Sequence, residues 1–469
     1  MRAIATTLTA ALTAACAVGP DYRPPEIDAG RGWSQPIAPA GADREPDLGR
    51  WWSAFGDPEL DQLVARALEQ NLDLRQATAR IAEARARRDA VAGGRYPLAD
   101  VSASITRRRQ SENGPLPINL IPGIERDQTI YEPGFDALWE LDLFGRTQRG
   151  VEAAEARVEA AIERHHNAQL MVAAETARTY LMLRGAQHEL DARRGAVTAS
   201  RRSTALVELQ LEAGEVPLAA LAQAQAELAT VEAGLPLLEA RVRAAALSIG
   251  TLLGDLPEAA LDLIDQAPRY APLAPYPLGE RAELLRRRPD VREAERALAA
   301  ASADVGVATA ELFPRLAIAA GGGFQSLTSG DLFDAASETW SLVPSISWRA
   351  LDGGRTRAQV HAAEARVEVA ALEYEKAVKQ ALTDAELALT RYDHGLDALE
   401  YQDAAVEAAR RSYGHATQRY DAGDISLLEL LDAERGLRSA EDAYARVYTQ
   451  TATDLVALFK ALGGGWQDG

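Results

Sequence analysis

A helical pattern without an internal proline runs from Gly354 to Asp421, and it constrains the fold of this chain more than any other feature. At about 1.5 Å per residue, such a helix would be roughly 100 Å long. Helices of globular proteins typically have about 8 to 20 residues, so this helix needs partners of similar length. Apolar residues recur along it every seven positions, which predicts coiled-coil packing against neighbouring helices. These residues are Val378, Ala385, Tyr392, Leu399, Val406, Tyr413 and Tyr420.

A turn ends this pattern, and an equivalent turn occurs earlier in the chain. Gly423 suits the left-handed conformation that commonly ends a helix, and Ser426 suits the N-cap of the next helix. Gly214 ends an equally long pattern that starts near Gly145. The chain is therefore predicted to contain two structural repeats. Repeat 1 is expected at 51–265, with strands at about 98–143 and a hairpin tip at 211–218, and repeat 2 at 266–462, with strands at about 315–351 and a tip at 419–426.

Within each repeat, apolar residues alternate with polar ones between the helices, as in amphipathic strands. Val101 and Ile105 share one apolar face, and Trp139, Trp340 and Trp348 lie on the apolar faces of other strands. The runs have roughly 9 to 12 residues, which is the length of a tilted membrane-spanning strand, and aromatic residues on the apolar face favour contact with lipid. A soluble hairpin on each repeat is the alternative. Loops are predicted at 111–128 and 326–337.

Four strands cannot close a sheet in a membrane. An open edge would leave backbone groups unsatisfied in lipid, at a cost of several kcal/mol each. Several chains must therefore contribute strands, and three chains would supply twelve. The mature chain contains no uninterrupted apolar run of about 18 residues, so no membrane-spanning helix is expected.

Composition and motifs disfavour nucleic-acid binding and catalysis. The formal net charge is −19, so nucleic-acid phosphates would be repelled. His165 and His166 are adjacent and point in different directions on a helix, so they do not form a metal-binding pair. Residues 321–323 are glycines within a strand pattern, where they fit close packing or curvature better than a phosphate loop. No enzyme activity, cofactor or metal is predicted.

The first residues have the pattern of a secretion signal. Residues 1–15 combine Arg2 with a small, apolar run that leads to Cys16, the only cysteine of the chain. Small residues before a lone cysteine resemble a bacterial lipoprotein cleavage site, which predicts acylation of Cys16. An ordinary signal with an incidental cysteine is the alternative. Residues 16–50 are then a lipidated, extended leader rich in proline and glycine, and 463–469 a C-terminal tail.

An ordered set of short motifs resembles outer membrane factor lipoproteins, the TolC-like exit ducts of efflux systems. The motifs are Cys16–Pro25, Trp51–Asp61, Asn71–Leu74, Leu143–Arg146, Asp352–Arg355 and Ala461–Trp466. The resemblance covers essentially the whole mature chain. It implies a mixed α and β membrane protein, a homotrimer in which a 12-stranded β-barrel with four strands per chain continues into a long α-helical coiled-coil barrel.

The resemblance also implies a function and a location. It implies a passive duct in the Gram-negative outer membrane with a long periplasmic part, the channel component of a tripartite efflux pump for small molecules. Its partners would be a periplasmic adaptor (membrane fusion) protein, an inner-membrane RND transporter and outer-membrane lipid, and nucleic acid is not among them. The duct would open at its periplasmic tip on docking. A duct for type I (ABC) protein secretion and a structural lipoprotein without a pore are the alternatives.

Site residues follow from the same resemblance. Glu429 and Asp432 match acidic residues that line the closed tip of family members, and they lie on one helical face. Three chains would bring six carboxylates into a ring that favours cations. A solvated helix face is the alternative.

Arg419 and Tyr420 match one side of a latch between hairpins. Gln210 and Ala220 depart from the family pattern on the other side, so Glu215 is considered as a partner. The hairpin turns are expected to contact the adaptor through Gly214, Val216, Pro217, Gly423, Ile425 and Ser426.

Overall fold

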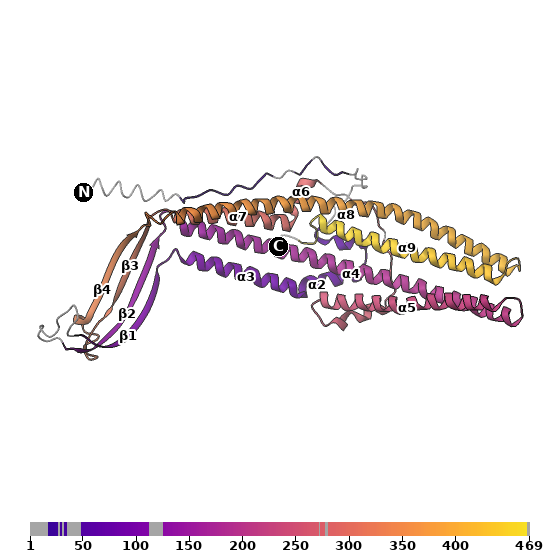
Figure 1. Ribbon diagram of the computed structural model, residues 1–469, viewed down its shortest axis with the longest axis horizontal. Helices are drawn as coiled ribbons and strands as arrows, with labels where there is room; N and C mark the ends of the chain where they lie inside the picture. The colour runs from indigo at the N-terminus through magenta and orange to yellow at the C-terminus, as the bar shows by residue number, and fades with distance from the viewer. Residues whose placement is uncertain are drawn as a thin grey trace. The chain divides into compact units, whose positions relative to one another are not determined.

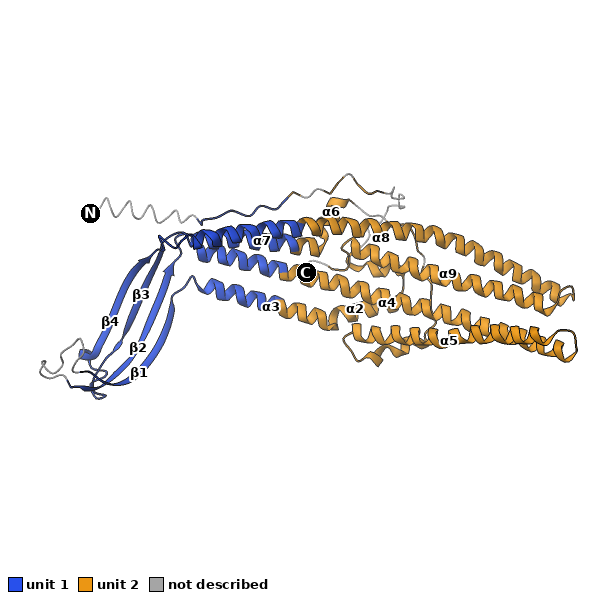
Figure 2. Ribbon diagram, in the orientation of Figure 1, with its two compact units in different colours: residues 1–25, 81–160, 294–374 blue, residues 26–80, 161–293, 375–469 orange. Residues whose placement is uncertain are grey.

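A computed structural model describes residues 17–26, 29–30, 32–34, 48–111, 125–271, 273–276 and 280–466. The predicted signal peptide, Cys16 and about half of the leader lie outside the described residues. The chain forms two compact units (Figure 2). We call residues 1–25, 81–160 and 294–374 the sheet unit, and residues 26–80, 161–293 and 375–469 the tip unit. Both halves of the sequence contribute to each unit.

The helices confirm that the long elements occur twice (Figure 1). Helices α4 and α8 have 67 residues each, and α5 and α9, which follow the two turns, have 35 each. The helical elements are η1 (Leu48–Phe55), α2 (Pro58–Gln70), α3 (Leu72–Gly93), α4 (Arg146–Glu212), α5 (Leu218–Leu252), η3 (Pro257–Asp265), α6 (Arg281–Arg287), α7 (Pro289–Ala310), η4 (Ala335–Ser337), α8 (Arg355–Asp421) and α9 (Leu427–Ala461).

The core of the tip unit contains the first aromatic motif of the chain. Trp51, Trp52 and Phe55 of η1 are buried. The Trp51 ring stacks on Phe459 of α9, with ring centroids 4.9 Å apart. Asp57 begins α2 by accepting a hydrogen bond from the Glu59 backbone N–H at 3.0 Å. The N-terminal motif therefore joins helices that are distant in sequence.

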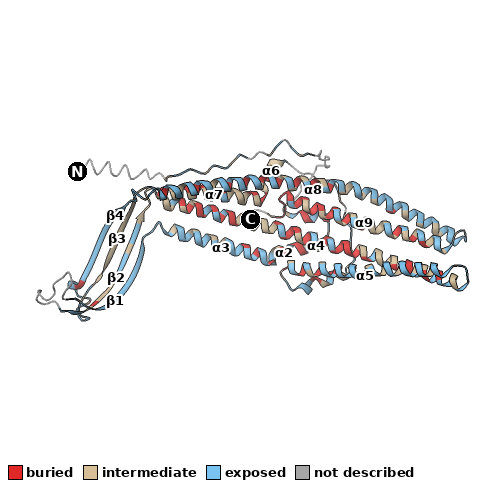
Figure 3. Cartoon of the chain, viewed as in Figure 1, coloured by how far each residue is buried: buried red, intermediate tan, exposed pale blue. Residues whose placement is uncertain are grey.

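The heptad seam of α8 is buried along its middle and opens toward the turn (Figure 3). Ala385, Tyr392 and Val406 are buried. Tyr413 is half-buried, and Tyr420 next to the turn is 37% exposed. The predicted packing of this helix is thus confirmed within the chain up to Val406. Nearer the turn, apolar residues of the seam remain accessible.

Four antiparallel strands in the order β1-β2-β3-β4 form the sheet. They are β1 (Leu98–Arg109), β2 (Asp127–Leu141), β3 (Arg315–Phe324) and β4 (Glu338–Ser347). The first loop was predicted to extend to Gln128, which is wrong by two residues. Asp127 and Gln128 pair with Arg109 and Arg108, so the hairpin ladder continues past the apolar part of the strand.

The strand register separates two faces. Val101 is paired with Phe135, Phe135 with Gly322, and Gly322 with Trp340, so one row crosses all four strands on the apolar face. The adjacent row of paired residues lies on the opposite face and is polar. It contains Asp100, Asp136, Gly321 and Ser341.

The glycines of β3 allow close approach of the neighbouring strand. A Cβ on Gly323 would lie 2.4 Å from the backbone oxygen of Pro133, and a Cβ on Gly322 would contact the Phe135 ring at 3.0 Å. The interpretation of residues 321–323 as a closely packed strand is confirmed.

Two tryptophans make equivalent hydrogen bonds at the corners between helix and strand. Trp139 Nε1 donates to the backbone oxygen of Arg95, and Trp348 Nε1 donates to that of Leu312, both at 3.0 Å. Each acceptor lies two residues before a proline, Pro97 or Pro314. The same contact therefore secures the start of the sheet in both repeats.

The described start of the leader is held by the sheet unit. Val18 N–H donates to the Phe144 backbone oxygen at 3.1 Å, and Arg149 binds both the Val18 oxygen at 3.1 Å and Asp21 Oδ1 at 2.7 Å. Gly19 lies against α7, because a Cβ there would be 2.5 Å from Gly306 Cα. These contacts fix the leader between Val18 and Asp21 against the sheet unit.

Candidate functional site

The two hairpin turns have the same backbone geometry and lie at the same end of the tip unit (Figure 1). Gly214 and Gly423 have φ angles of +76° and +79°. Glu215 N–H donates to the Gln210 oxygen and Asp424 N–H to the Arg419 oxygen, both at 2.8 Å. A six-residue closure of this kind, with glycine in the left-handed region, is a Schellman motif. Gly214 and Gly423 therefore end α4 and α8 as predicted.

The start of α9 has a capping box that the start of α5 lacks. Ser426 Oγ accepts a hydrogen bond from Glu429 N–H at 3.3 Å, and Glu429 Oε2 accepts from Ser426 N–H at 2.8 Å. Pro217 occupies the N-cap of α5 and makes no side-chain cap bond. Bonds from Ser426 lower the pKa of the exposed Glu429 carboxyl below its ordinary value, and Arg419 contributes a smaller electrostatic effect. The spacing of Ser426 and Glu429 is the sequence signal for a capping box. From the sequence, only Ser426 was predicted as a cap.

Asp432 is exposed to solvent near the start of α9. Its side chain is 77% exposed and lies 3.7 Å from Arg435 Nη1. The same guanidinium nitrogen is 3.2 Å from Glu227 of α5. Arg435 thus links α9 to α5 and leaves Asp432 with a weak, exposed ion pair. Exposed pairs of this kind contribute about 0–1 kcal/mol.

The latch candidates are not joined within one chain. Among the described residues, no hydrogen bond or ion pair connects Arg419 or Tyr420 to Glu215. Glu215 is exposed, and its backbone N–H is used in the turn. The latch therefore stays a prediction.

The turn residues expected to contact the adaptor form two exposed loops. Gly214, Pro217, Gly423 and Ser426 are exposed, whereas Val216 and Ile425 are half-buried. Next to them, Leu218 is 70% exposed and Leu428 is 45% exposed. Each hairpin thus presents a leucine beside its turn, which is a feature that docking to a protein partner would explain.

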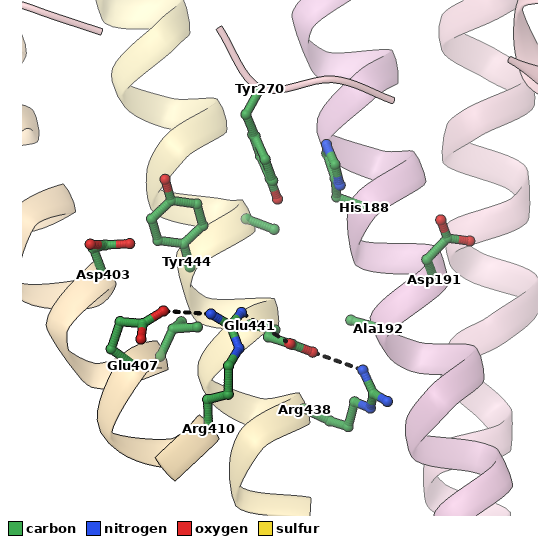
Figure 4. Close-up of a pocket in the computed structure, with 12 residues that line it drawn as sticks. His188, Asp191, Ala192, Tyr270, Asp403, Glu407, Arg410, Arg438, Glu441 and Tyr444 are labelled. Atoms are coloured by element: carbon green, nitrogen blue, oxygen red, sulfur yellow. Dashed lines mark hydrogen bonds and ion pairs between the residues drawn. The ribbon is translucent and has the colours of Figure 1, made fainter. Parts of the chain in front are cut away.

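A cavity of about 410 Å³ lies among α4, α8, α9 and the segment at Tyr270 (Figure 4). Its charged side chains form a network in which Arg410 pairs with Glu407, and Arg438 binds Glu441 at 2.9 Å. The lining residues are His188, Asp191, Ala192, Tyr270, Asp403, Val406, Glu407, Arg410, Arg438, Glu441, Tyr444 and Ala445. Four separate segments supply the walls of this cavity, so no pattern in the sequence predicted it.

His188 is the perturbed group of the cavity. Its ring lies parallel to that of Tyr270, with centroids 3.8 Å apart. Burial lowers the pKa of His188 to about 4, although Asp191 opposes the shift. Within the described part of the chain, its Nε2 atom is buried without a hydrogen-bond partner. The neutral imidazole therefore serves as a flat packing surface for Tyr270.

His166 makes ring contacts that fit a structural role. His166 stacks on Trp466, with centroids 4.5 Å apart, and Arg292 lies over the same indole. In the residues that the structure covers, no group of three or more histidine, cysteine, aspartate or glutamate side chains could hold a metal ion. None of the described helices is both long enough and apolar enough to cross a bilayer.

Comparison with known proteins identifies the architecture. A family profile described as "Outer membrane efflux protein" matches residues 63–255 and 281–464. The chain is 34% identical over 447 residues to the pyoverdine export outer membrane protein OpmQ of Pseudomonas putida, covering 93% of this chain and 92% of that protein. It is 31% identical over 468 residues to the toluene efflux pump outer membrane protein TtgF of Pseudomonas putida, with 97% and 95% covered. The solved structure of the outer-membrane channel OprN has 38% sequence identity and a TM-score of 0.81, with 97% and 100% covered.

The chain belongs to the outer membrane efflux protein family. It is the outer-membrane channel component of a tripartite efflux pump, with a long periplasmic part, and it works with an adaptor and an inner-membrane transporter. The TolC-like fold predicted from the sequence is confirmed.

Proposed function

We propose that three copies of this chain form a passive duct for small molecules, without a catalytic step and without a cofactor. The observation that carries this proposal is the open sheet. Among the described residues, strands β1 and β4 each pair on one side only, and apolar side chains such as Val101 and Trp340 are 87% and 79% exposed on one face. In lipid, the unpaired edges must be joined to other strands. Three four-stranded sheets joined edge to edge would satisfy them.

The polar face of the sheet would then line the duct. Asp100, Ser102 and Ser104 lie on this face of β1, and Asp136 lies opposite Asp100 on β2. A polar face of this kind suits a water-filled passage, whereas the apolar face suits lipid. We further propose that Cys16 carries a covalent lipid, which would anchor the leader beside the sheet.

At the periplasmic end, Glu429 and Asp432 are proposed to form the acidic ring. Both side chains are exposed in the single chain and lie on one face of α9. Threefold symmetry would bring six carboxylates together, and their field would favour cations over anions. Glu429 differs from Asp432 because its carboxylate is also engaged in the capping box.

The partners proposed in detail are a periplasmic adaptor, which would bind the two hairpin turns, and an inner-membrane transporter of the RND type. Relatives with 31–34% identity are named for different cargo, pyoverdine in one case and toluene in another. This supports a duct that accepts chemically diverse small molecules, with the choice of cargo made mostly by the inner-membrane pump. Docking of the adaptor would open the tip.

The test is single-channel recording from the purified protein in planar bilayers, with its oligomeric state measured by native mass spectrometry. A trimer with small, cation-selective currents is expected. Glu429→Gln combined with Asp432→Asn should shift the reversal potential in a salt gradient toward zero while the trimer persists. Glu212→Gln, which removes one exposed charge at the end of α4, is the control and should leave selectivity unchanged. A soluble oligomer that does not insert into the bilayer, or a monomer that conducts, would refute the proposal.

A further inference from the structure

The apolar face of the sheet changes character at the end of β1. Val101, Ala103 and Ile105 share this face with Phe135 and its neighbours on β2. The next residues on the same face, two and four positions further along the strand, are Arg107 and Arg109. An apolar row that faces lipid therefore ends in two guanidinium groups.

These arginines lie at the outer end of the sheet. β1 begins after α3 and ends at Arg109, so the connection between β1 and β2 is at the end of the sheet away from the helices (Figure 2). In the proposed duct, the helices form the periplasmic part. The end of β1 that carries the arginines is consequently the one nearer the cell exterior.

The depth of the arginines matches the boundary of the hydrocarbon region. Trp139, held by its hydrogen bond to the corner at Arg95, is the aromatic residue expected at the inner boundary. Thr129 on the same strand is the register partner of Arg107. Ten residue steps at about 3.3 Å span about 33 Å along the strand, and a tilt of about 40° reduces this to about 25 Å across the membrane. That is the height of the apolar band of outer-membrane strands.

The two arginines differ in how their charges are used. Arg109 forms a two-bond pair with Asp127, with Nε–Oδ1 and Nη2–Oδ2 distances of 2.7 and 2.6 Å. Arg107 is exposed, and among the described residues it forms no hydrogen bond or ion pair. Arg108, between them, lies on the opposite face and bonds to Gln128. Arg107 thus presents, on the lipid side, a guanidinium whose donors no described residue uses.

We propose that Arg107, supported by Arg109, binds the phosphate groups of lipopolysaccharide in the outer leaflet, an inference that rests on the proposed membrane-inserted duct. The outer leaflet of this membrane carries lipid A, whose sugar phosphates lie at the polar boundary. The planar guanidinium offers paired donors that fit phosphate oxygens. Its apolar stem can lie along the acyl chains while the charged end reaches the phosphate.

Glu338 offers a competing partner. It lies on the same face, at the outer end of β4. If β4 of one chain joins β1 of a second copy, Glu338 of the first chain could pair with Arg107 of the second. The test must therefore distinguish a lipid contact from a contact between chains.

The experiment measures binding of bisphosphorylated lipid A to the purified, full-length trimer in detergent by native mass spectrometry. One arginine near an anionic lipid surface contributes about 1 kcal/mol, which corresponds to about fivefold in affinity. Arg107→Gln should weaken binding about fivefold, whereas Arg107→Lys should lose less than about twofold. Arg108→Gln, which removes an adjacent charge from the opposite face, is the matched control and should bind as the wild type does. Monophosphorylated lipid A should bind less tightly, and its affinities for the wild type and for Arg107→Gln should differ less.

Three results would overturn the proposal. Equal binding by Arg107→Gln and Arg108→Gln would show that the face of the strand does not matter. An undiminished difference between wild type and Arg107→Gln with monophosphorylated lipid A would argue against phosphate recognition. Dissociation of the trimer in both Arg107→Gln and Glu338→Gln would assign Arg107 to the contact between chains. Insertion is recorded in parallel in bilayers without lipopolysaccharide, and a wild-type protein that fails to insert there would count against the duct itself rather than against the lipid site.

Discussion

Replacement of Ser426 by alanine tests whether the start of α9 is stabilised separately from the turn that precedes it. The Ser426 hydroxyl accepts from Glu429 N–H at 3.3 Å and donates to Glu429 Oε2 at 2.9 Å. Loss of a serine N-cap costs about 1 kcal/mol. Because Gly423 and its backbone bonds are untouched, this cost should be confined to the first turn of α9. Opening of that turn should become about fivefold more frequent, since about 1.4 kcal/mol corresponds to a factor of ten.

Hydrogen–deuterium exchange with mass spectrometry can measure this effect. In the Ser426→Ala protein, the amides of Glu429 and Leu430 should exchange about fivefold faster than in the wild type. Peptides covering the start of α5, where Pro217 provides no side-chain cap, should be unchanged. The pKa of Glu429 should move part of the way back toward its ordinary value, because the hydroxyl bond is lost and the backbone bond remains.

Ser426→Thr is the matched control, because it keeps the hydroxyl and should retain slow exchange. Unchanged exchange at Glu429 and Leu430 in Ser426→Ala would refute the capping argument. Equal acceleration in α5 would also refute it, because the effect would then be a general loosening of the tips.

Further outcomes follow from single contacts. Gly423→Ala should lower stability by about 1 kcal/mol, because alanine resists the left-handed conformation, and a thermal-unfolding comparison with Gly414→Ala, which should be neutral or stabilising in a helix interior, checks this. Trp348→Phe should destabilise by about 0.5–1 kcal/mol through loss of its bond to the Leu312 oxygen, whereas Trp340→Phe, which breaks no hydrogen bond of the described residues, should cost less. Burial lowers the pKa of His188 to about 4 from 6.5, so the unfolded chain binds more protons between these pH values and stability should be lost as pH falls from 6.5 to 4. After allowance for solvent screening the loss is about 2 kcal/mol, and His188→Gln should flatten that part of the stability curve.

Much of this architecture was predictable because it depends on local rules. The period of the apolar residues, the absence of proline in α8 and the glycines at 214 and 423 were enough to place the long helices and their turns. The alternation around Val101 and Trp340 likewise separated the two faces of the sheet. The start of β2 was misplaced because Asp127 and Gln128 are polar, and only their pairing with β1 makes them part of the strand.

The candidate site was less predictable than the fold. Glu429 was expected only as a charge near the duct axis, and its capping bond to Ser426 was overlooked although both residues were visible in the sequence. The cavity around His188 could not be predicted, because no spacing in the sequence indicates that Tyr270 will lie flat against that ring. The latch between Arg419, Tyr420 and Glu215 has no counterpart among the described contacts of one chain.

The sequence by itself determined the elements whose conformation depends on residues close together in the chain: helices, turns and the period of the strands. The tertiary structure alone decided which distant groups meet, such as Trp139 with the oxygen of Arg95, or Arg149 with Val18 and Asp21. The physical reason is that backbone preferences act over a few residues, whereas a contact between distant residues exists only once packing has fixed both partners in space.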